Sequence, residues 1–335
     1  MKFSTTTSAI AVAIIALAGT AQAADYSANI ELDSTARSGT QTKDTTDAGL
    51  TQSGRVELNA TGKAGTGITV SGKAAFLAKK DGTAAIDDMW VSVNNAAGSG
   101  LKLGRFEATD LFPIAQDTVV NNAGVGGVYG TNLLRGRKDS NQFHAAGTLA
   151  LGGGLAIELG LVETKQASTI NGTGLITTPI TKGIRPVVTY ASGPLSLAAG
   201  LETGNILLSA PPVADKVKFT GFGFTGGYDF GGFKLTGDFA TAKVKTTAEQ
   251  KRTSFALTAQ VASFAGGLIA AKNALAGGAN EKITTLYASY KLPLFDVKDA
   301  FITPALSISK ATDAGNVAGA SLKDTSVRVR INYTF

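Results

Sequence analysis

The sequence predicts an all-β protein, a 16-stranded antiparallel transmembrane β-barrel. Three observations predict it. Apolar and polar residues alternate in short segments, the connections between these segments alternate between short and long, and no apolar run beyond the N-terminus reaches the roughly 18 residues of a membrane-spanning helix. Alternation of this kind is typical of strands with one face toward lipid and the other toward water.

The N-terminus is typical of a secretory signal peptide. Lys2 precedes the apolar run 9–18, which is followed by Ala21-Gln-Ala23. A basic start, an apolar centre and small residues before the cleavage point define such peptides. We expect residues 1–23 to be removed and residues 24–335 to form one barrel domain.

The first strand shows the alternation on which the other strand predictions depend. Tyr26, Ile30 and Leu32 share one face, and Asn29 and Glu31 lie on the other. Further strands are predicted near 55–60, 68–79, 86–94, 100–106, 139–149, 154–163, 184–191, 194–202, 217–229, 232–243, 252–262, 267–273, 282–291, 298–309 and 324–335. Seven short turns and eight longer loops join them, as sixteen antiparallel strands require when both termini lie on one side.

The last strand has the clearest period of two. Val327, Val329 and Ile331 lie on one face, and Arg328 and Arg330 on the other. Two arginines facing a dry core would be costly, so this strand indicates a water-filled lumen. Together with Lys73, these arginines are further candidates for lumenal residues.

The connection at about 107–138 is the longest in the chain. Connections of this length in compact domains usually have a function or are disordered. Its first half carries the carboxylates Glu107, Asp110 and Asp117 beside an apolar patch, and its second half is rich in Gly and Asn. We expect an inward-folded constriction loop after the fifth strand, which narrows the channel.

Several short stretches together resemble the general porins of Gram-negative outer membranes. They are Ser53–Gly62, Leu101–Arg105, Thr109–Pro113 with the following Asp117, Arg137–Phe143, and the terminal Tyr333-Thr-Phe335. The resemblance implies a water-filled channel, a homotrimer in outer-membrane lipid and lipopolysaccharide, and recognition of Phe335 by the barrel-assembly machinery.

The resemblance also implies a constriction with two charged sides. The basic side would be formed by Arg55, Arg105 and Arg137, and the acidic side by Glu107, Asp110 and Asp117. The sequence departs from many porins after the loop proline, where it has Ile114 in place of a glutamate. Arg105 shares the parity of Leu101 and Leu103, so it points inward only if the chain bulges or leaves the wall at Gly104.

Other signals do not support a catalytic, metal or nucleic-acid site. Basic residues exceed acidic ones by a net charge of +6 but are spread along the chain, unlike a nucleic-acid stripe. The spacing Gly221–Gly226 matches a dinucleotide motif but is followed by a turn, not a helix. His144 has no other His or any Cys with which to bind a metal, and a hydrolase would need Ser, His and an acid or amide within reach, which His144 with Ser140 leaves only formally open.

We therefore predict a passive outer-membrane channel for small hydrophilic solutes and ions, without a cofactor, a metal or covalent chemistry. The net charge and Ile114 favour weak anion preference. Two alternatives remain open: a channel specific for a sugar or for an anion such as phosphate, and a secreted adhesive or binding β-protein.

Overall fold

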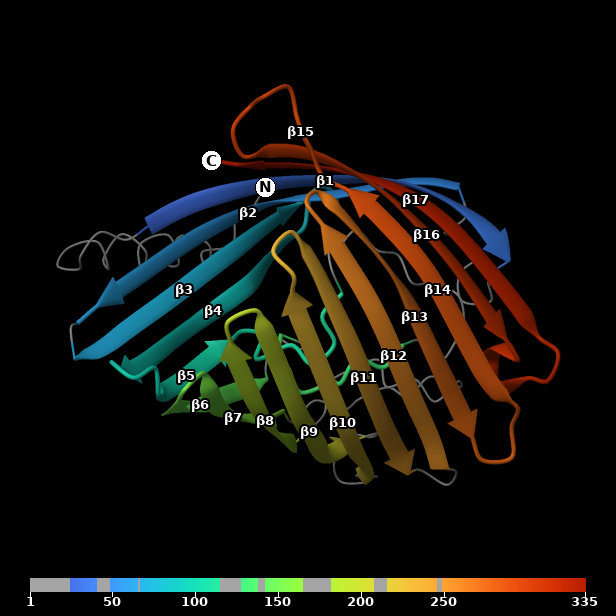
Figure 1. Cartoon of the computed structure of the whole chain (residues 1–335), viewed down its shortest axis with the longest axis horizontal. Coiled ribbons are helices and arrows are strands. Elements are labelled where there is room, and N and C mark those ends of the chain that lie inside the picture. The colour runs from blue at the N-terminus through green and yellow to red at the C-terminus, as the bar shows by residue number, and fades with distance from the viewer. Residues whose placement is uncertain are drawn as a thin grey trace, which may run out of the picture.

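The computed structural model describes residues 25–40, 49–65, 67–114, 128–137, 142–164, 182–207, 216–245 and 249–335. Its architecture is one antiparallel sheet that closes on itself (Figure 1). The strands are β1 Asp25–Thr40, β2 Gly49–Ala64, β3 Ile68–Lys79, β4 Ala84–Asn95, β5 Gly100–Arg105, β6 Phe143–Gly152, β7 Leu155–Glu163, β8 Lys182–Ser192, β9 Leu195–Leu207, β10 Lys216–Asp229, β11 Phe233–Lys245, β12 Glu249–Val261, β13 Phe264–Leu275, β14 Asn280–Tyr290, β15 Leu292–Pro293, β16 Ala300–Thr312 and β17 Ser321–Thr334.

The first and last strands close the barrel. β1 pairs with β2 on one side and with β17 on the other, from Asn29 opposite Thr334 to Thr40 opposite Lys323. Figure 1 shows these two ends of the chain side by side. β15 has only two residues and, like β14 before it, pairs with β16. The sheet is therefore a closed barrel of sixteen strands, as the sequence predicts, with the two-residue β15 as a short addition beside β16.

The sixteen-stranded arrangement is confirmed, and several strands extend further than predicted. The strand predicted near 139–149 begins at Phe143 in the structure, and residues 139–141 lie outside the described residues. β1 continues to Thr40 and β2 begins at Gly49, although the sequence predicted a loop from residue 35. Polar residues at these ends pair across the two strands, for example Thr35 with Thr51. Hydrogen bonding between the strands therefore continues beyond the part of the sequence that alternates clearly.

The two faces of the wall have opposite character. Large apolar side chains are exposed on one face, for example Leu286 at 56% and Tyr290 at 47% on β14, whereas Thr285 and Ser289, which directly precede them in the strand, are buried. In a closed sheet the exposed apolar face is the outer one, and the polar residues line the interior. This is the reverse of a soluble β-sandwich and matches a barrel that faces lipid.

Little helix occurs in the described residues. The 3₁₀ turn η3, Ala314–Asn316, lies in the connection before β17. No helix among the residues that the structure describes is long and apolar enough to cross a membrane. The predicted signal peptide, residues 1–23, lies outside the described residues.

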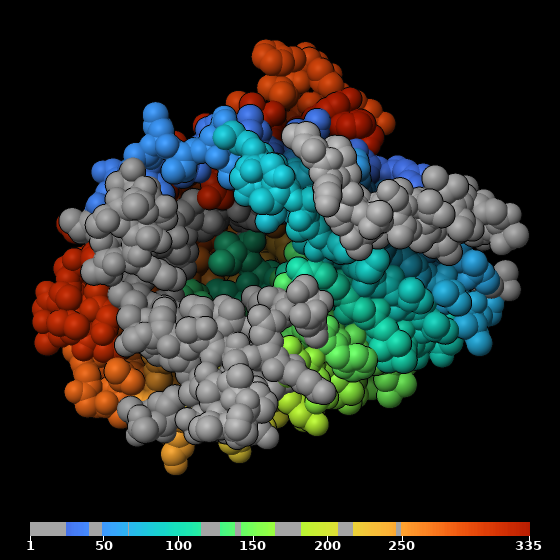
Figure 2. All heavy atoms as spheres, turned by 180° about the vertical axis from the view of Figure 1, so that it is seen from behind, coloured from blue at the N-terminus to red at the C-terminus, as the bar shows by residue number. Residues whose placement is uncertain are grey.

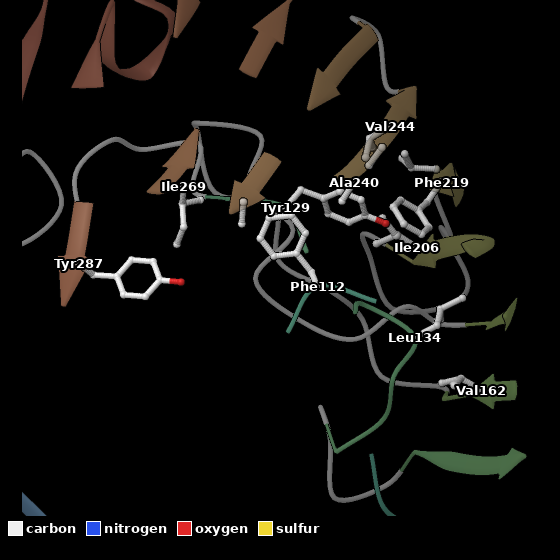
Figure 3. Packing of buried hydrophobic residues seen from close by; sticks show 13 residues of the cluster. Phe112, Tyr129, Leu134, Val162, Ile206, Phe219, Ala240, Val244, Ile269 and Tyr287 are labelled. Carbon is white, nitrogen blue, oxygen red and sulfur yellow. The ribbon is translucent and has the colours of Figure 1, made fainter. Parts of the chain in front are cut away.

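The main apolar cluster lies inside the barrel. It packs residues from the connection between β5 and β6 against inward-facing residues of β9 to β14 (Figure 3). Its members include Phe112, Tyr129 and Leu134 from the connection, and Phe219 and Ile269 from the wall. The connection is thus held inside the barrel by apolar packing as well as by polar contacts.

Candidate functional site

The connection between β5 and β6 has two described limbs, residues 106–114 and 128–137, which we call the inner segment. The two limbs are joined by a backbone hydrogen bond in which Ala108 N donates to Arg135 O at 2.8 Å. They contact strands far along the chain. Tyr129 N donates to Ser254 Oγ at 3.0 Å on β12, and Thr131 Oγ1 donates to Phe222 O at 3.0 Å on β10.

Arg185 on β8 is the main polar anchor of the inner segment. Its side chain is fully buried, and its Nη2 donates to Thr109 O at 2.7 Å and to Thr131 O at 3.2 Å. One guanidinium therefore binds both limbs. Its planar fork of donors makes arginine suited to bridging several acceptors.

Two wall carboxylates complete this anchor. Glu202 on β9 lies 3.2 Å from Arg185 Nε and accepts hydrogen bonds from Leu134 N at 2.9 Å and from Tyr129 OH at 2.7 Å. Glu158 on β7 accepts from Thr109 N at 3.2 Å. Burial, and then the charge of Glu202, hold the pKa of Tyr129 well above its usual value, so the phenol stays neutral and donates.

Within the inner segment, acids and arginines lie next to one another. Arg135 lies 3.3 Å from Glu107 and 3.1 Å from Asp110, and its Nε donates to Ala108 O at 2.9 Å. Arg137 lies 3.4 Å from Glu107. The predicted residues Glu107, Asp110 and Arg137 are thus brought together, and Arg135 joins them. Asp117 lies outside the described residues.

A β-bulge in β4 supplies two further acids. The register between β3 and β4 shifts so that Ala74 is opposite Met89 and Phe76 is opposite Ile86. Asp87 and Asp88 lie in this irregularity, and both contact Arg137 Nη1, at 2.9 and 3.4 Å. Regular alternation would place neighbouring side chains on opposite faces, so the bulge is what directs both carboxylates to one arginine.

The predicted residues Lys73 and Arg105 also lie at this bulge. Lys73 Nζ donates to Asp88 Oδ2 at 2.9 Å. Arg105 Nε donates to the carbonyls of Ile86 and Asp87 at 3.0 and 2.9 Å. The backbone turns at Gly104, whose φ of +122° is unfavourable for other residues, and a Cβ there would lie 2.2 Å from Met89 O. Gly104 and Arg105 remain paired with Trp90 and Met89 of β4, so the chain does not leave the wall at Gly104, and the inward orientation of Arg105 stays a prediction.

The remaining predicted basic residues form a separate group on β17, β1 and β2. Arg330 Nη2 donates to Asp33 Oδ2 at 2.7 Å, and its Nη1 lies 3.2 Å from Glu31. Glu31 in turn lies 3.7 Å from Arg55. Arg328 Nε donates to Thr35 Oγ1 at 3.1 Å. Arg55 is thus paired with wall carboxylates, including Glu57 at 3.9 Å.

Charge alternates along both groups. At the bulge, Lys73, Arg135 and Arg137 are interleaved with Asp87, Asp88, Glu107 and Asp110, and in the second group Arg55 and Arg330 share Glu31. Figure 2 shows the molecule hollowed at its centre, with the barrel wall around the hollow. Such an arrangement offers charged and hydrogen-bonding surface to water and ions that enter the barrel.

The sequence did not identify Arg185, Glu202, Glu158 or Tyr129 as important. Each has the appearance of an ordinary strand or loop residue in the sequence. His144, set aside as a ligand, stacks on Phe106 with ring centroids 3.9 Å apart. No group of three or more His, Cys, Asp or Glu suited to a metal ion occurs among the described residues.

A closed antiparallel barrel with an apolar outer face and a charged interior defines the class of outer-membrane channel proteins. The comparison with protein families agrees with this. The model described as "Gram-negative porin" matches residues 6–294, and the chain belongs to that family.

Solved structures share the fold at low sequence identity. The chain is similar to the anion-selective porin of Comamonas acidovorans, with 19% identity and a TM-score of 0.63, covering 93% of this chain and 99% of that one. It is also similar to the outer-membrane channel DcaP of Acinetobacter baumannii, with 13% identity and a TM-score of 0.65, covering 93% of this chain and 97% of that one. The trimer form of OmpT of Vibrio cholerae has 13% identity and a TM-score of 0.62, covering 94% of this chain and 100% of that one. No curated protein sequence matches the chain significantly.

Family and fold together establish the general function. The protein is a porin of the outer membrane, a channel for passive diffusion. The alternative of a secreted adhesive protein is not supported by these comparisons.

Proposed function

We propose that this porin conducts small hydrophilic solutes and ions without covalent chemistry or a cofactor, and that the segment 107–138 forms the constriction of its lumen. The observation that carries the proposal is the anchoring of the inner segment. Arg185 binds carbonyls of both described limbs, which supports a segment held against the inner wall instead of one that extends outward. A segment held in this way reduces the width open to solutes, and pore width sets the size limit.

The charged lining of the constriction is assigned to two groups of residues. The first comprises Arg105, Arg137, Glu107 and Asp110 with the additional Arg135, Asp87 and Asp88, and the second comprises Arg55 with Arg328 and Arg330. Asp117 remains a proposed member of the acidic side.

We also propose weak anion preference. It was based on the net charge and on Ile114. Exposed lysines such as Lys218, Lys245, Lys272 and Lys282 contribute to the basic excess, and these lie on the outer face of the barrel. Ile114 packs against the apolar cluster beside Phe112, so it still contributes no charge where many porins have a carboxylate.

The partners and targeting follow from the family and from the ends of the chain. We propose a homotrimer embedded in outer-membrane lipid and lipopolysaccharide, exported through a signal peptide at 1–23, and assembled through recognition of Phe335. The trimer form of OmpT, which has a similar fold, is in line with this assembly.

Thiol labelling tests the constriction directly, because the chain contains no cysteine. The variant D110C, reconstituted in a planar bilayer, should lose part of its single-channel conductance when a charged thiol reagent is added. The matched control L286C, whose side chain is on the outer face, should keep its conductance. Absence of stepwise conductance in the unmodified protein would overturn the channel itself, and an unchanged conductance of labelled D110C would overturn the constriction.

A further inference from the structure

Four buried glycines lie on the inner face of the wall beside the anchor pair Arg185 and Glu202. Glycine weakens the interior of a strand, because it has no side chain to pack and loses more backbone freedom on folding than other residues. Four such positions in one area of the wall therefore need an explanation. They are Gly183 on β8, Gly200 on β9, and Gly221 and Gly223 on β10, which we call the glycine socket.

The glycine socket occupies neighbouring positions on three adjacent strands. Gly200 and Gly223 are directly opposite each other on β9 and β10, and Gly221 is opposite Glu202. Gly183 lies two residues before Arg185 and therefore on the same face of β8. The four glycines thus lie around the ion pair that holds both limbs of the inner segment.

The backbone does not require glycine at these four positions. None of the four has a φ in the positive region that disfavours other residues, unlike Gly104 on β5. What each position lacks is space. A Cβ added at any of the four would lie within 2.7 Å of an atom of the inner segment, which is closer than Cβ atoms approach other atoms in proteins. In strands, glycine often marks such a close approach of another part of the chain.

Each glycine of the socket faces a different side chain of the inner segment. All four facing side chains are buried, with 4% exposure or less. The inner segment is therefore in close contact with the wall at four separate points. The pairs are Gly183 with Leu134 Cδ1, Gly200 with Leu111 Cδ1, Gly221 with the Tyr129 hydroxyl, and Gly223 with Thr131 Oγ1 and Cβ.

Thr131 is the least able of these residues to yield. Its Oγ1 donates to Phe222 O at 3.0 Å, and its backbone has a φ of +51°, which few residues other than glycine adopt. Its Cβ, which moves only with the backbone, would lie 2.7 Å from a Cβ added at Gly223. Because carbon atoms pack at roughly 3.5–4.0 Å, an alanine at this position requires the inner segment itself to move by on the order of 1 Å.

Tyr129 makes a similar approach at Gly221. Its hydroxyl donates to Glu202 Oε2 at 2.7 Å, and its ring packs against Phe219 with the ring centroids 6.2 Å apart (Figure 3). A side chain at position 221 would collide with the hydroxyl beside the carboxylate. The spacing Gly221–Gly226, which matches a dinucleotide motif in the sequence, thus has a packing explanation at its first two glycines.

We infer that the glycine socket sets the size limit of the channel, because its four glycines are positioning residues that let the inner segment lie close against the wall. The inference rests on the constriction proposed above and adds residues that determine its width. The wall at the socket cannot easily retreat, since β8, β9 and β10 are each paired with a strand on both sides. A side chain in the socket therefore moves the inner segment into the lumen.

Swelling of liposomes that contain the full-length protein, with sugars of increasing size, tests the inference. In G223A, the uptake rate of a trisaccharide should fall about threefold more than that of a monosaccharide, because pore width sets the size limit. The matched control is G160A on the inner face of β7, where the added Cβ meets only ordinary contacts at 3.5 Å. G160A should keep the size dependence of the unmodified protein.

A complementary truncation separates displacement of the inner segment from general damage. In G223A/T131G the added methyl group no longer meets a side chain at position 131, so trisaccharide uptake should return to the level of T131G alone. If G223A gives no folded barrel by heat-modifiable migration on gels, recovery of the folded form in G223A/T131G is the expected result.

Two results would overturn the inference. One is a size dependence of G223A equal to that of G160A, and the other is a double variant that remains as restricted, or as unfolded, as G223A. Reduced conductance of labelled D110C together with an unchanged size limit in G223A would leave the constriction in place and remove only the role of the glycine socket.

Discussion

Arg185 and Glu202 form a fully buried ion pair inside the barrel, with 3.2 Å between Nε and Oε1. The pair also holds the inner segment, because the guanidinium donates to Thr109 O and Thr131 O while the carboxylate accepts from Leu134 N. Two wall residues thus determine where a long connection lies.

The variant R185M should be strongly destabilised. It leaves the Glu202 carboxylate buried without its cation, which typically costs about 3–5 kcal/mol. The unfolding midpoint, followed by heat-modifiable migration on gels, should fall, and the mean conductance should rise as the inner segment loosens. The double variant R185M/E202L should recover part of the stability, because no uncompensated charge remains. An R185M protein as stable as the original would show that the pair is not the anchor.

Tyr129 should give stability that depends on alkaline pH. Its pKa in the folded protein is well above the value of about 10 expected when unfolded. The stabilising contribution is therefore complete below about pH 10 and is lost as the pH rises through the folded pKa. Y129F, which lacks the bond to Glu202, should be less stable at neutral pH by about 1–3 kcal/mol. The difference in unfolding midpoint between the two proteins should shrink at high pH, and a constant difference would contradict this.

Removal of the acids at the β4 bulge should change ion selectivity. The variant D87N/D88N removes two negative charges beside Arg137 and Lys73. The reversal potential in a KCl gradient should shift toward anions, because the remaining cations are no longer balanced. The variant K272S/K282S changes the net charge on the outer face and should leave the reversal potential as it is. A shift of equal size in both would show that selectivity follows overall charge.

Arg55 tests the second charged group, on β17, β1 and β2. R55E places a third carboxylate beside Glu31 and Glu57, so the reversal potential should shift toward cations. K251E makes the same charge change on the outer face of β12 and is the matched control. An unchanged potential in R55E would place this side chain away from the path of the ions.

Gly104 should not tolerate a side chain. With φ at +122° and Met89 O only 2.2 Å from an added Cβ, G104A is expected to cost about 1–3 kcal/mol. In G147A on β6 the added Cβ meets nothing within 4 Å, so its unfolding midpoint should change little. Equal midpoints for the two variants would remove the argument for a special backbone at Gly104.

The sequence predicted the wall of the barrel well because alternation is a local signal. On β14, Leu286 is exposed and the adjacent Thr285 is buried, as expected when successive side chains of a strand point to opposite faces. The end of β1 was missed because polar pairs such as Thr35 and Thr51 carry no such contrast. Strand existence was therefore predictable, and strand length was not.

The site was predicted less well because it depends on irregular backbone and distant contacts. Nothing in the Asp87-Asp88 dipeptide reveals that a bulge directs both side chains to Arg137, which is fifty residues further along the chain. Arg185 precedes Pro186 in a strand with no distinguishing motif, yet it binds residues from two limbs of another connection. Parity predicted that Arg105 needs an irregular backbone to point inward, and the neighbouring Gly104 has a positive φ although both residues remain paired with β4.

Arginines described above, such as Arg185 and Arg330, lie on the inner face of the barrel, whereas many exposed lysines lie on its outer face. The basic residues of the chain therefore influence different properties of the protein. Exposed lysines of the outer face, such as Lys272 and Lys282, contribute to the sequence pI of about 9.3. Chromatographic behaviour and attraction to anionic surfaces should therefore respond to lysines that no permeating ion passes. Isoelectric point and conductance are two properties of this protein that can be altered independently.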